Sequence, residues 1–480
     1  MTVPGNRSNA KVLRPERCVV SDGKPCAACT EDVKLEQEIR ELEKTIEELH
    51  NRRRALRTVM NENHDHLIHK FPPEIASHIF IKYAPPSASH HKKDRSTPLR
   101  LGSVCRKWRQ LAWATPQLWS SVVIGPAKAP LELLAEWLER SASLPLTITF
   151  YGRSGQNDGV SQILNKHSAR WYDIHLNVAP TCFPRFDGSS EGNILHRLIL
   201  DSPIYITPSD PPKFSMKSQP CPTDLTLLRV GLPSVDIIWN NLTVASVDGI
   251  GVHDCVELIR RAPVLQTLRL RAIKTSPSIF PLPNTRIVHP HIRSLETSIF
   301  RNPSTFAAFL DSVAFPSLEQ WTHNYPPFLM ENFISFIEWS PHLKMFKLNI
   351  NNAPADRVIQ LLRHLPSLEF LELCQEPLMH GGVITIELID MLVCASSESP
   401  RFLPCLQSLK FVSKTVFPWE SLPQIFALPR WRSLRVKVSA PLGGNGHAAK
   451  LLWGLVKGGF ELSINGDGEI DTPPEDLWYY

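Results

Sequence analysis

A short apolar sequence motif recurs through the second half of the chain and restricts its fold more than any other feature. In each copy a proline is followed two residues later by an apolar residue, which we number offset zero. Further apolar residues stand three and usually five positions after it, at offsets three and five. Seven copies share this form, and their first apolar residues are Leu265, Ile292, Leu318, Leu343, Leu368, Leu406 and Trp431. The first five starts lie 27, 26, 25 and 25 residues apart. Because one copy is too small to form a core, neighbouring copies must stack on one another.

The period of 25 to 27 residues is that of leucine-rich repeats. The stretch "RVIQLLRHLP" (357–366) is amphipathic and stops at a proline, which cannot continue a helix. Each unit is therefore predicted to be one helix followed by one short strand, and stacked units form an irregular α/β solenoid. Looser copies begin at Leu195, Leu225 and Leu242. The alternative is a set of unrelated helices and strands within one α/β domain.

Two earlier segments have the same helix-to-strand order. Residues 131–150 read as a helix followed by the strand "PLTITF", and residues 163–178 repeat that order. We interpret both as irregular first repeats, so the predicted repeat domain spans residues 123–480.

Composition argues against several other classes of protein. The 480-residue chain carries 52 basic and 47 acidic residues, a net charge of +5 that is too small to indicate nucleic-acid binding. No signal-like start or membrane-length apolar run is present. The 10 cysteines lack the spacing of a disulfide framework. These features predict a cytoplasmic and/or nuclear protein with reduced thiols.

No motif for catalysis or metal binding is convincing. The chain has no phosphate-binding glycine loop, no G-x-S-x-G motif and no H-E-x-x-H motif. Cys26 and Cys29 form a CxxC pair, but a zinc site needs further ligands at suitable spacing. We therefore expect no enzyme activity, no cofactor and no metal.

The N-terminal region divides into a polar tail and a charged helix. Residues 1–29 lack periodicity and are predicted to be disordered. Residues 30–62 form a predicted helix with heptad spacing, interrupted by Arg53. Its apolar positions are Leu35, Ile39, Leu42, Ile46, Leu49, Leu56 and Met60. Residues 31–60 are interpreted as a coiled coil that forms a homodimer, as a helix packed on its own domain, or as an isolated solvated helix.

Residues 63–122 read as a small helical unit. A first helix starts at the prolines of "FPPEI" and carries apolar residues at Ile75, Ile79, Phe80 and Tyr83. After the polar insert 84–98, apolar residues from Leu101 to Ala112 lie on one face of a second helix, which ends at Thr115-Pro116. Periodicity alone does not distinguish an internal core from a binding face, because so small a domain is marginally stable.

The phrases "FPPEI…IF" and "LRLGSVCRKWRQLAWATPQLW" resemble an F-box. This resemblance implies a three-helix module that binds the Skp-type adaptor of cullin–RING ubiquitin ligases. The residues that it implies face the adaptor are Phe71, Pro72, Ile75, Ile79, Leu101, Val104, Cys105 and Trp108. The layout of an F-box, then "WLERSASLPLTI", then divergent repeats is similar to large F-box families of mushroom-forming fungi.

The resemblance leads to a functional hypothesis: a non-catalytic substrate-recognition subunit of an SCF-type E3 ubiquitin ligase. Its partners would be the Skp-type adaptor with its cullin complex and an unknown target protein, and no membrane. Exposed strand residues predicted to face the target are Gln266, Arg269, Lys344, Lys347, Glu369, Glu372, Gln407 and Lys410. The alternatives are an interaction scaffold outside any ligase and, less favoured, a nucleic-acid binder that uses the Arg52–Arg57 cluster.

Overall fold

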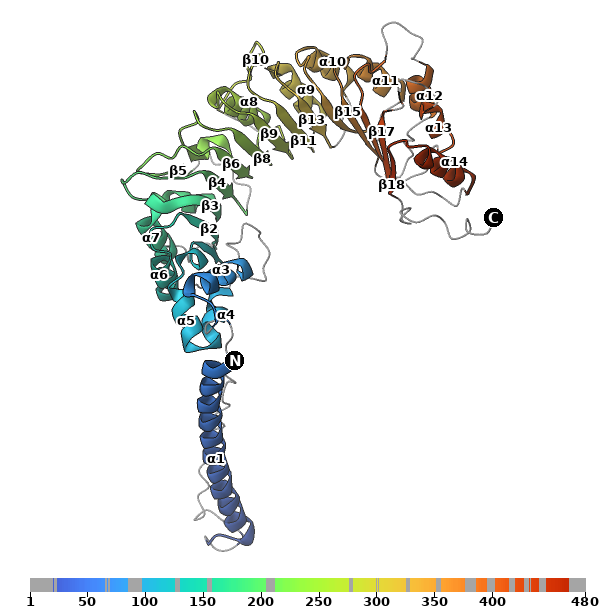
Figure 1. The fold of residues 1–480 in the computed structure, drawn as a ribbon. Coiled ribbons are helices and arrows are strands. Elements are labelled where there is room, and N and C mark those ends of the chain that lie inside the picture. The colour runs from blue at the N-terminus through green and yellow to red at the C-terminus, as the bar shows by residue number, and fades with distance from the viewer. Residues whose placement is uncertain are drawn as a thin grey trace. The chain divides into compact units, whose positions relative to one another are not determined.

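The computed structural model consists of two compact units, and we describe each by itself (Figure 1). The first unit ends at Leu118 and the second begins at Trp119. Most of the predicted tail 1–29 and of the insert 84–98 lies outside the described residues. Apart from a few single positions, the described ranges are 24–64, 70–84, 97–125, 130–152, 158–203, 212–275, 279–298, 302–324, 329–350, 355–375, 386–394, 402–413, 419–426, 433–439 and 446–465.

The first unit contains a long helix and a group of short helices. Helix α1 (Ala27–His64) covers the predicted heptad segment and extends a few residues beyond it at each end. The short helices are α3 (Pro73–Tyr83), α4 (Thr97–Val104), α5 (Arg106–Trp113) and the 3-10 turn η3 (Pro116–Leu118). Helix α3 begins directly after Pro72 and has Pro73 at its first position, where a backbone N–H is not needed.

The single helix predicted across residues 101–112 is wrong, because the structure breaks it into α4 and α5. Cys105 adopts an extended conformation, with φ −154° and ψ 175°. Its thiol accepts a hydrogen bond from the backbone N–H of Trp108 at 3.4 Å and so caps α5. Arg109 donates from Nε to the carbonyl of Gly102 at 2.8 Å, which ties the two helices together. A cysteine at a helix start is not a usual capping signal, so periodicity did not show the break.

The second unit is built on one parallel sheet whose described strands follow each other in chain order (Figure 1). Every neighbouring pair is parallel, so after each strand the chain must cross back to the end of the sheet where all strands begin. The strands of this 14-stranded sheet are β1 (Ser121–Ile124), β2 (Leu146–Tyr151), β3 (Trp171–Asn177), β4 (Arg197–Asp201), β6 (Asp224–Leu228), β8 (Val244–Asp248), β9 (Thr267–Arg271), β11 (Ser294–Ser298), β13 (Gln320–His323), β14 (Met345–Asn349), β15 (Phe370–Gln375), β16 (Ser408–Ser413), β17 (Arg435–Ser439) and β18 (Leu462–Asn465).

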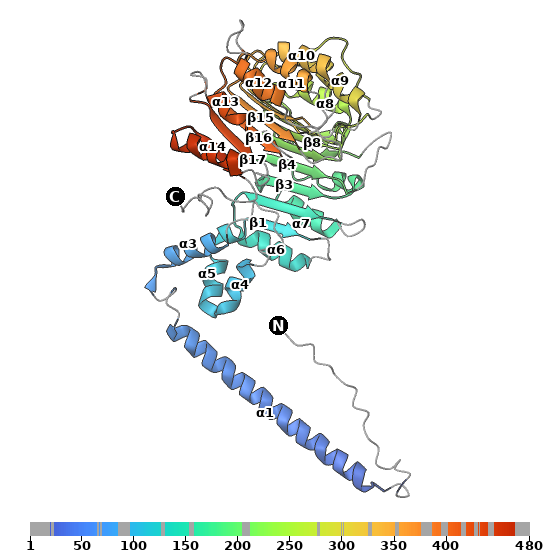
Figure 2. The same cartoon turned by 90° about the vertical axis from the view of Figure 1, so that its right-hand side faces the viewer.

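Helices make most of the return connections and lie along the outer side of the curved sheet (Figures 1 and 2). They are α6 (Leu131–Arg140), α7 (Asp158–Lys166), α8 (Val252–Arg261), α9 (Pro303–Ser312), α10 (Met330–Glu338), α11 (Ala355–Arg363), α12 (Ile386–Cys394), α13 (Leu422–Phe426) and α14 (Gly446–Lys457). Short 3-10 turns occupy Ser168–Arg170, Pro180–Arg185 and Leu232–Ser234. Two small parallel pairs join β5 (Phe214–Ser215) to β7 (Val235–Asp236) and β10 (Ile287–Val288) to β12 (Val313–Ala314).

The apolar residues at offset three form one buried row across the sheet. Leu268, Leu295, Trp321, Phe346 and Leu371 are register partners on consecutive strands, and each is at most 1% exposed. Offset three is therefore a core position. The apolar pattern of these copies correctly predicted which strand residues face the helices.

Two copies were predicted in the wrong register. Leu225 was assigned offset zero, but it pairs with Leu198 and so occupies offset three. Val436 was assigned offset five, but it pairs with Leu409, which also occupies offset three. In "LTLLRV" (225–230) apolar residues stand two and three positions apart, so the spacing fits more than one register.

The sheet begins before residue 123, where the repeat domain was predicted to start. Strand β1 starts at Ser121 and pairs with β2. Trp119 is fully buried in the second unit, and its ring packs edge-on against Trp137 with centroids 4.8 Å apart. Among the described residues, no helix is both long and apolar enough to cross a membrane.

Candidate protein-interaction surfaces

Helix α3 carries two adjacent apolar stripes, one buried and one exposed. Ala76 and Phe80 point inward and are each 1% exposed. The other stripe has apolar residues at every fourth position, Phe71 just before the helix and Ile75, Ile79 and Tyr83 on it, which are 45%, 47%, 38% and 66% exposed. Successive helix residues are about 100° apart, so this stripe lies beside the buried one and widens the apolar side of α3 beyond what its own domain covers. We call these four residues the outer α3 face.

The inward side of α3 is held by contacts with α5 and the segment that follows it. The rings of Phe80 and Trp108 have centroids 4.8 Å apart. The Thr115 hydroxyl lies 3.1 Å from the Ser77 hydroxyl and donates to the carbonyl of Leu111 at 2.7 Å. These contacts orient α3 so that its second apolar stripe stays at the surface.

The structure divides the predicted adaptor-facing residues into exposed and enclosed groups. Phe71, Pro72, Ile75 and Ile79 are exposed on or beside α3, and Val104 is 47% exposed at the end of α4. Cys105 and Trp108 are half-buried, and each takes part in the internal contacts described above. Leu101 is only 4% exposed, so it belongs to the core of the unit and not to its exposed surface. Tyr83 is not among the residues predicted to face the adaptor, although it continues the four-residue spacing of the outer α3 face.

Residues 68–125 match the F-box-like family. This F-box-like domain contains helices α3 to α5, whose surface is described above. A comparison with curated proteins finds no match. Among solved structures, the chain is similar to a structural-genomics target from Bacteroides fragilis, at 14% identity over 66% of this chain and 73% of that chain, with a TM-score of 0.29. That similarity is too weak to support an argument about fold or function.

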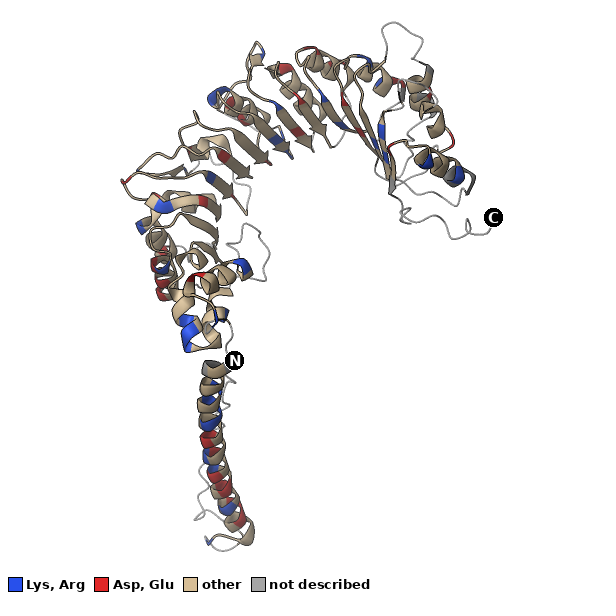
Figure 3. Cartoon of the chain, in the orientation of Figure 1, with Lys and Arg blue, Asp and Glu red and all other residues tan. Residues whose placement is uncertain are grey.

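Beyond the F-box-like domain, the sheet unit presents a row of polar residues at the centre of its strands. They stand between the two buried positions of each strand, offsets three and five, and therefore point to the opposite side of the sheet. Successive register partners in this mid-strand row are Arg269, Glu296, Thr322, Lys347, Glu372, Lys410 and Lys437. Figure 3 shows the charges spread along the strands. Four cations and two anions make the row net positive.

Ion pairs organise the charges of the mid-strand row. Glu296 lies 3.7 Å from Arg269 and 3.0 Å from Arg271. Glu372 accepts from Lys410 at 2.9 Å and lies 3.2 Å from Lys347. Burial alone raises the pKa of Glu372, but its hydrogen bonds with Lys410 and Lys347 outweigh this effect and hold the pKa below its ordinary value. Lys437, at the end of the row, is exposed.

The eight residues predicted to face a target fall into two adjacent rows. Arg269, Lys347, Glu372 and Lys410 belong to the mid-strand row. Glu372 is only 7% exposed, so its prediction as an exposed strand residue is wrong: Lys347 and Lys410 cover its carboxylate. The other four, Gln266, Lys344, Glu369 and Gln407, stand just before their strands, where backbone N–H groups donate to the preceding repeat at 2.8–2.9 Å. Glu296, Thr322 and Lys437 are not among the residues predicted to face a target, although Glu296 and Thr322 lie between offsets three and five of recognised copies.

Two cysteines of the sheet unit, Cys374 and Cys255, have thiols with a raised pKa. Burial, followed by the nearby Glu372 carboxylate, raises the pKa of Cys374 to about 11. Burial likewise raises the pKa of Cys255. Only a thiolate is a good nucleophile, so neither thiol is suited to carry a thioester at neutral pH. Within the described ranges, no group of three or more potential metal ligands occurs.

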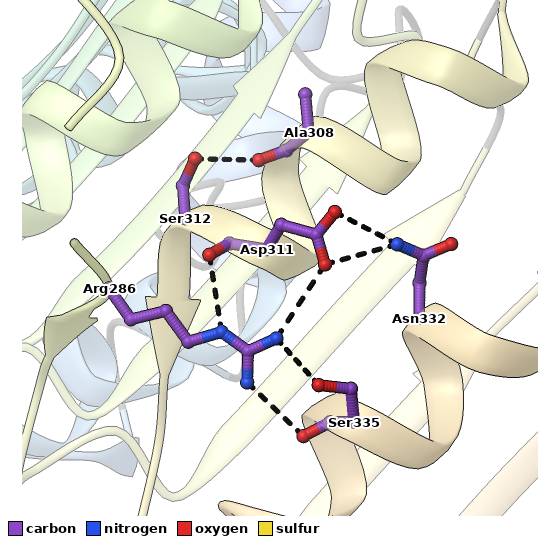
Figure 4. Close-up of polar contacts among 6 residues, drawn as sticks. All are labelled: Arg286, Ala308, Asp311, Ser312, Asn332 and Ser335. Carbon is purple, nitrogen blue, oxygen red and sulfur yellow. Dashed lines mark hydrogen bonds and ion pairs between the residues drawn. The ribbon is translucent and has the colours of Figure 1, made fainter. Parts of the chain in front are cut away.

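On the helix side of the sheet, Arg286 joins two consecutive helices (Figure 4). Its guanidinium donates to the carbonyl of Asp311 at the end of α9, at 3.2 Å, and lies 3.6 Å from the Asp311 carboxylate. It also donates to the carbonyl and hydroxyl of Ser335 in α10, at 3.2 and 2.8 Å. Asn332 donates to both carboxylate oxygens of Asp311 at 3.0 and 2.9 Å. This network fixes the spacing of the two helices.

Proposed function

We propose that the protein is a substrate-recognition subunit of an SCF-type, cullin–RING E3 ubiquitin ligase. The outer α3 face would bind a Skp-type adaptor. One observation carries the proposal: a helix of the F-box-like domain buries one apolar stripe and leaves a second apolar stripe at the surface. Contiguous exposed apolar surface of this kind is characteristic of protein-binding sites.

We further propose that the sheet unit is an irregular leucine-rich-repeat solenoid, of the kind seen in fungal F-box proteins. The chain-ordered parallel strands and the buried row at offset three support this proposal. The mid-strand row lies on the side opposite the helices, where repeat proteins bind their partners. Its net positive charge favours a target with acidic residues.

The role of the chain in ubiquitin transfer would be to position the target. The adaptor and cullin would bring a charged E2, which supplies the thioester, close to the bound target. The raised pKa of Cys374 and Cys255 agrees with a receptor that takes no covalent part. The complex would act in the cytoplasm or nucleus, and the spacing of the 10 cysteines, which is not that of a disulfide framework, supports this.

The adaptor face is tested with two double variants of the full chain. Ile75→Asp/Val104→Asp places two carboxylates on exposed apolar positions of α3 and α4. Ser103→Asp/Gln110→Asp adds the same charges at exposed polar positions of α4 and α5. Binding to a purified Skp-type adaptor is measured by isothermal titration calorimetry. The first variant should lose binding, because an unpaired charge buried in an interface is costly. The second variant should bind within about threefold of the wild type.

Retained binding by a folded Ile75→Asp/Val104→Asp chain would contradict the assignment of the adaptor face. Pull-down of the wild-type chain from native extract then tests the ligase role. Recovery of both adaptor and cullin would support it. Recovery of adaptor without cullin would instead favour the alternative, an interaction scaffold outside the ligase.

A further inference from the structure

Helix α1 carries an apolar seam along its whole length. The heptad positions Leu35, Ile39, Leu42, Ile46, Leu49, Leu56 and Met60 are each 49–60% exposed. Helix α1 is 38 residues long. Helices in proteins gain most of their stability from packing an apolar side against a partner, so an exposed seam of this length indicates that a partner covers it. No described part of the chain covers the seam.

The pattern of α1 favours a coiled coil with a second copy of itself. The alternating steps of four and three assign leucines to the d positions, Leu35, Leu42, Leu49 and Leu56. Ile39, Ile46 and Met60 occupy a positions, and Arg53 is the single charged a residue between Leu35 and Met60. One polar a residue selects a register. Because the first half of α1 is acidic and its second half is basic, the helix is complementary in charge to a reversed copy of itself.

The flanking charges oppose a parallel arrangement. In a parallel, in-register pair, each g residue faces the e residue five positions later on the partner. The facing pairs would be Glu31 with Glu36, Glu38 with Glu43, and Arg52 with Arg57, all of like charge. Arg53 would also meet the partner's Arg53 within the seam. Each of these contacts is repulsive.

An antiparallel arrangement removes these conflicts. With Leu35 opposite the partner's Met60, every seam residue faces another seam residue. The remaining layers pair Ile39 with Leu56, Leu42 with Arg53, and Ile46 with Leu49. Arg53 then lies beside a leucine and not beside a second arginine. The acidic first half of each helix faces the basic second half of its partner, so that Glu36 lies near the partner's Arg57.

We propose that α1 pairs with α1 of a second copy as an antiparallel two-stranded coiled coil. The seam from Leu35 to Met60 is about 38 Å long at 1.5 Å per residue. The two F-box-like domains would therefore follow from opposite ends of the coil. This proposal does not depend on the ligase role, because α1 takes no part in the proposed adaptor or target contacts.

Orientation is tested by cross-linking the full chain with a short bis-maleimide. Two variants are made, Leu35→Cys and Met60→Cys, and each is treated alone and as an equal mixture. Mass spectrometry of the linked peptides separates engineered links from native thiols. The antiparallel coil predicts links between positions 35 and 60 in the mixture only. Links of 35 to 35 and of 60 to 60 in the single-variant samples would overturn the orientation.

Dimerisation is tested by sedimentation equilibrium of Ile46→Asp/Leu49→Asp, which charges the central layer of the seam. The matched control, Lys44→Asp/Asn51→Asp, places two carboxylates on the opposite, outer side of the helix. The seam variant should be monomeric and less helical by circular dichroism, whereas the control should stay dimeric. A monomeric wild type at about 50 μM, or a seam variant that remains dimeric, would overturn the proposal.

A single charge change gives an independent test of orientation. Glu36→Arg brings like charges together at the partner's Arg57 in the antiparallel coil, so the dimer dissociation constant should rise about fivefold. In a parallel coil the same change would face Glu31 and strengthen the dimer. The added change Arg57→Glu should restore wild-type affinity in the antiparallel coil. A lower dissociation constant for Glu36→Arg alone would contradict the proposal.

Discussion

Thr297 and His323 are register partners on β11 and β13, and each replaces the apolar residue expected at offset five. The Thr297 hydroxyl lies 2.9 Å from Nδ1 of His323. It also accepts a hydrogen bond from Nε1 of Trp321 at 3.1 Å. The imidazole stacks on Phe306 with centroids 4.9 Å apart and rings within 1° of parallel. The Thr297 hydroxyl and Nδ1 of His323 thus pair inside an apolar core, whereas Nε2 of His323 is buried without a hydrogen-bond partner.

This arrangement makes the stability of the sheet unit sensitive to acid. Burial lowers the pKa of His323 from 6.5 to about 3. Between these values the unfolded chain binds a proton that the folded chain does not, so the free energy of unfolding falls as the pH drops below 6.5. The loss at pH 5 should be ~2 kcal/mol. Urea unfolding at pH 7 and pH 5 should show a correspondingly smaller loss for His323→Leu. An equal loss in the wild type and in His323→Leu would refute this account. His342→Leu, at an exposed position, is the control and should lose as much stability at pH 5 as the wild type.

The two substitutions should also be energetically coupled. Thr297→Val removes the hydroxyl that contacts both His323 and Trp321, and should cost about 1–3 kcal/mol because buried polar atoms lose a partner. When Thr297→Val is combined with His323→Leu, the total cost should fall short of the sum by about 1 kcal/mol. A double-mutant cycle in urea measures this difference. Strictly additive costs would show that the contact carries no coupling.

Glu372 is only 7% exposed and is expected to be a stabilising residue. Glu372→Gln would leave Lys347 and Lys410 without their shared carboxylate and should lower the free energy of unfolding by about 1–3 kcal/mol at pH 7. Because the pKa of Glu372 is lowered in the folded chain, its contribution is present above pH 4.5 and is lost as the pH falls further. Glu369→Gln is the control, since Glu369 is more exposed and lies 3.9 Å from Lys344. Equal effects of the two changes would contradict the prediction.

The Arg286 network should contribute measurably to the packing of α9 and α10. Arg286→Ala removes donors to Asp311 and Ser335 and should cost about 1–3 kcal/mol. Arg286→Lys cannot reproduce the planar fork of donors and should recover only part of this loss. Exposed Arg293, 4.0 Å from Glu319, is a suitable comparison, and Arg293→Ala should cost at most about 0.5 kcal/mol. Thermal unfolding of the three variants ranks the effects, and an Arg286→Ala loss no larger than that of Arg293→Ala would be evidence against the network.

The F-box-like domain should tolerate charge at exposed apolar positions but not in its core. Ile75→Asp/Val104→Asp should change the stability of the unbound chain little, since both side chains are 47% exposed. Leu101→Asp should unfold the domain, because Leu101 is 4% exposed and a buried carboxylate has no partner there. Thermal unfolding and limited proteolysis compare the variants. A stable Leu101→Asp chain would place Leu101 outside the core.

Periodic features of the sequence predicted a large part of this structure. Heptad spacing correctly predicted α1, and the recurring proline and leucine positions predicted the strands of the copies from Leu265 to Leu406, whereas the copy at Trp431 was assigned the wrong register. Such patterns are visible locally, because residues two positions apart on a strand, or three or four positions apart on a helix, lie on the same side of their element. The apolar outer α3 face was also visible in the sequence, although its exposure was not.

Features that depend on residues distant in the chain required the folded structure. Local periodicity alone did not reveal the cap at Cys105, the register at Leu225 or the hydrogen bond between Thr297 and His323. Arg286 contacts Ser335, 49 positions away, only because stacking brings consecutive helices together. Short-range spacing thus dictates which side of a helix or strand is apolar. Which polar atoms meet depends on how neighbouring units pack, because hydrogen bonds require positions accurate to a few tenths of an ångström.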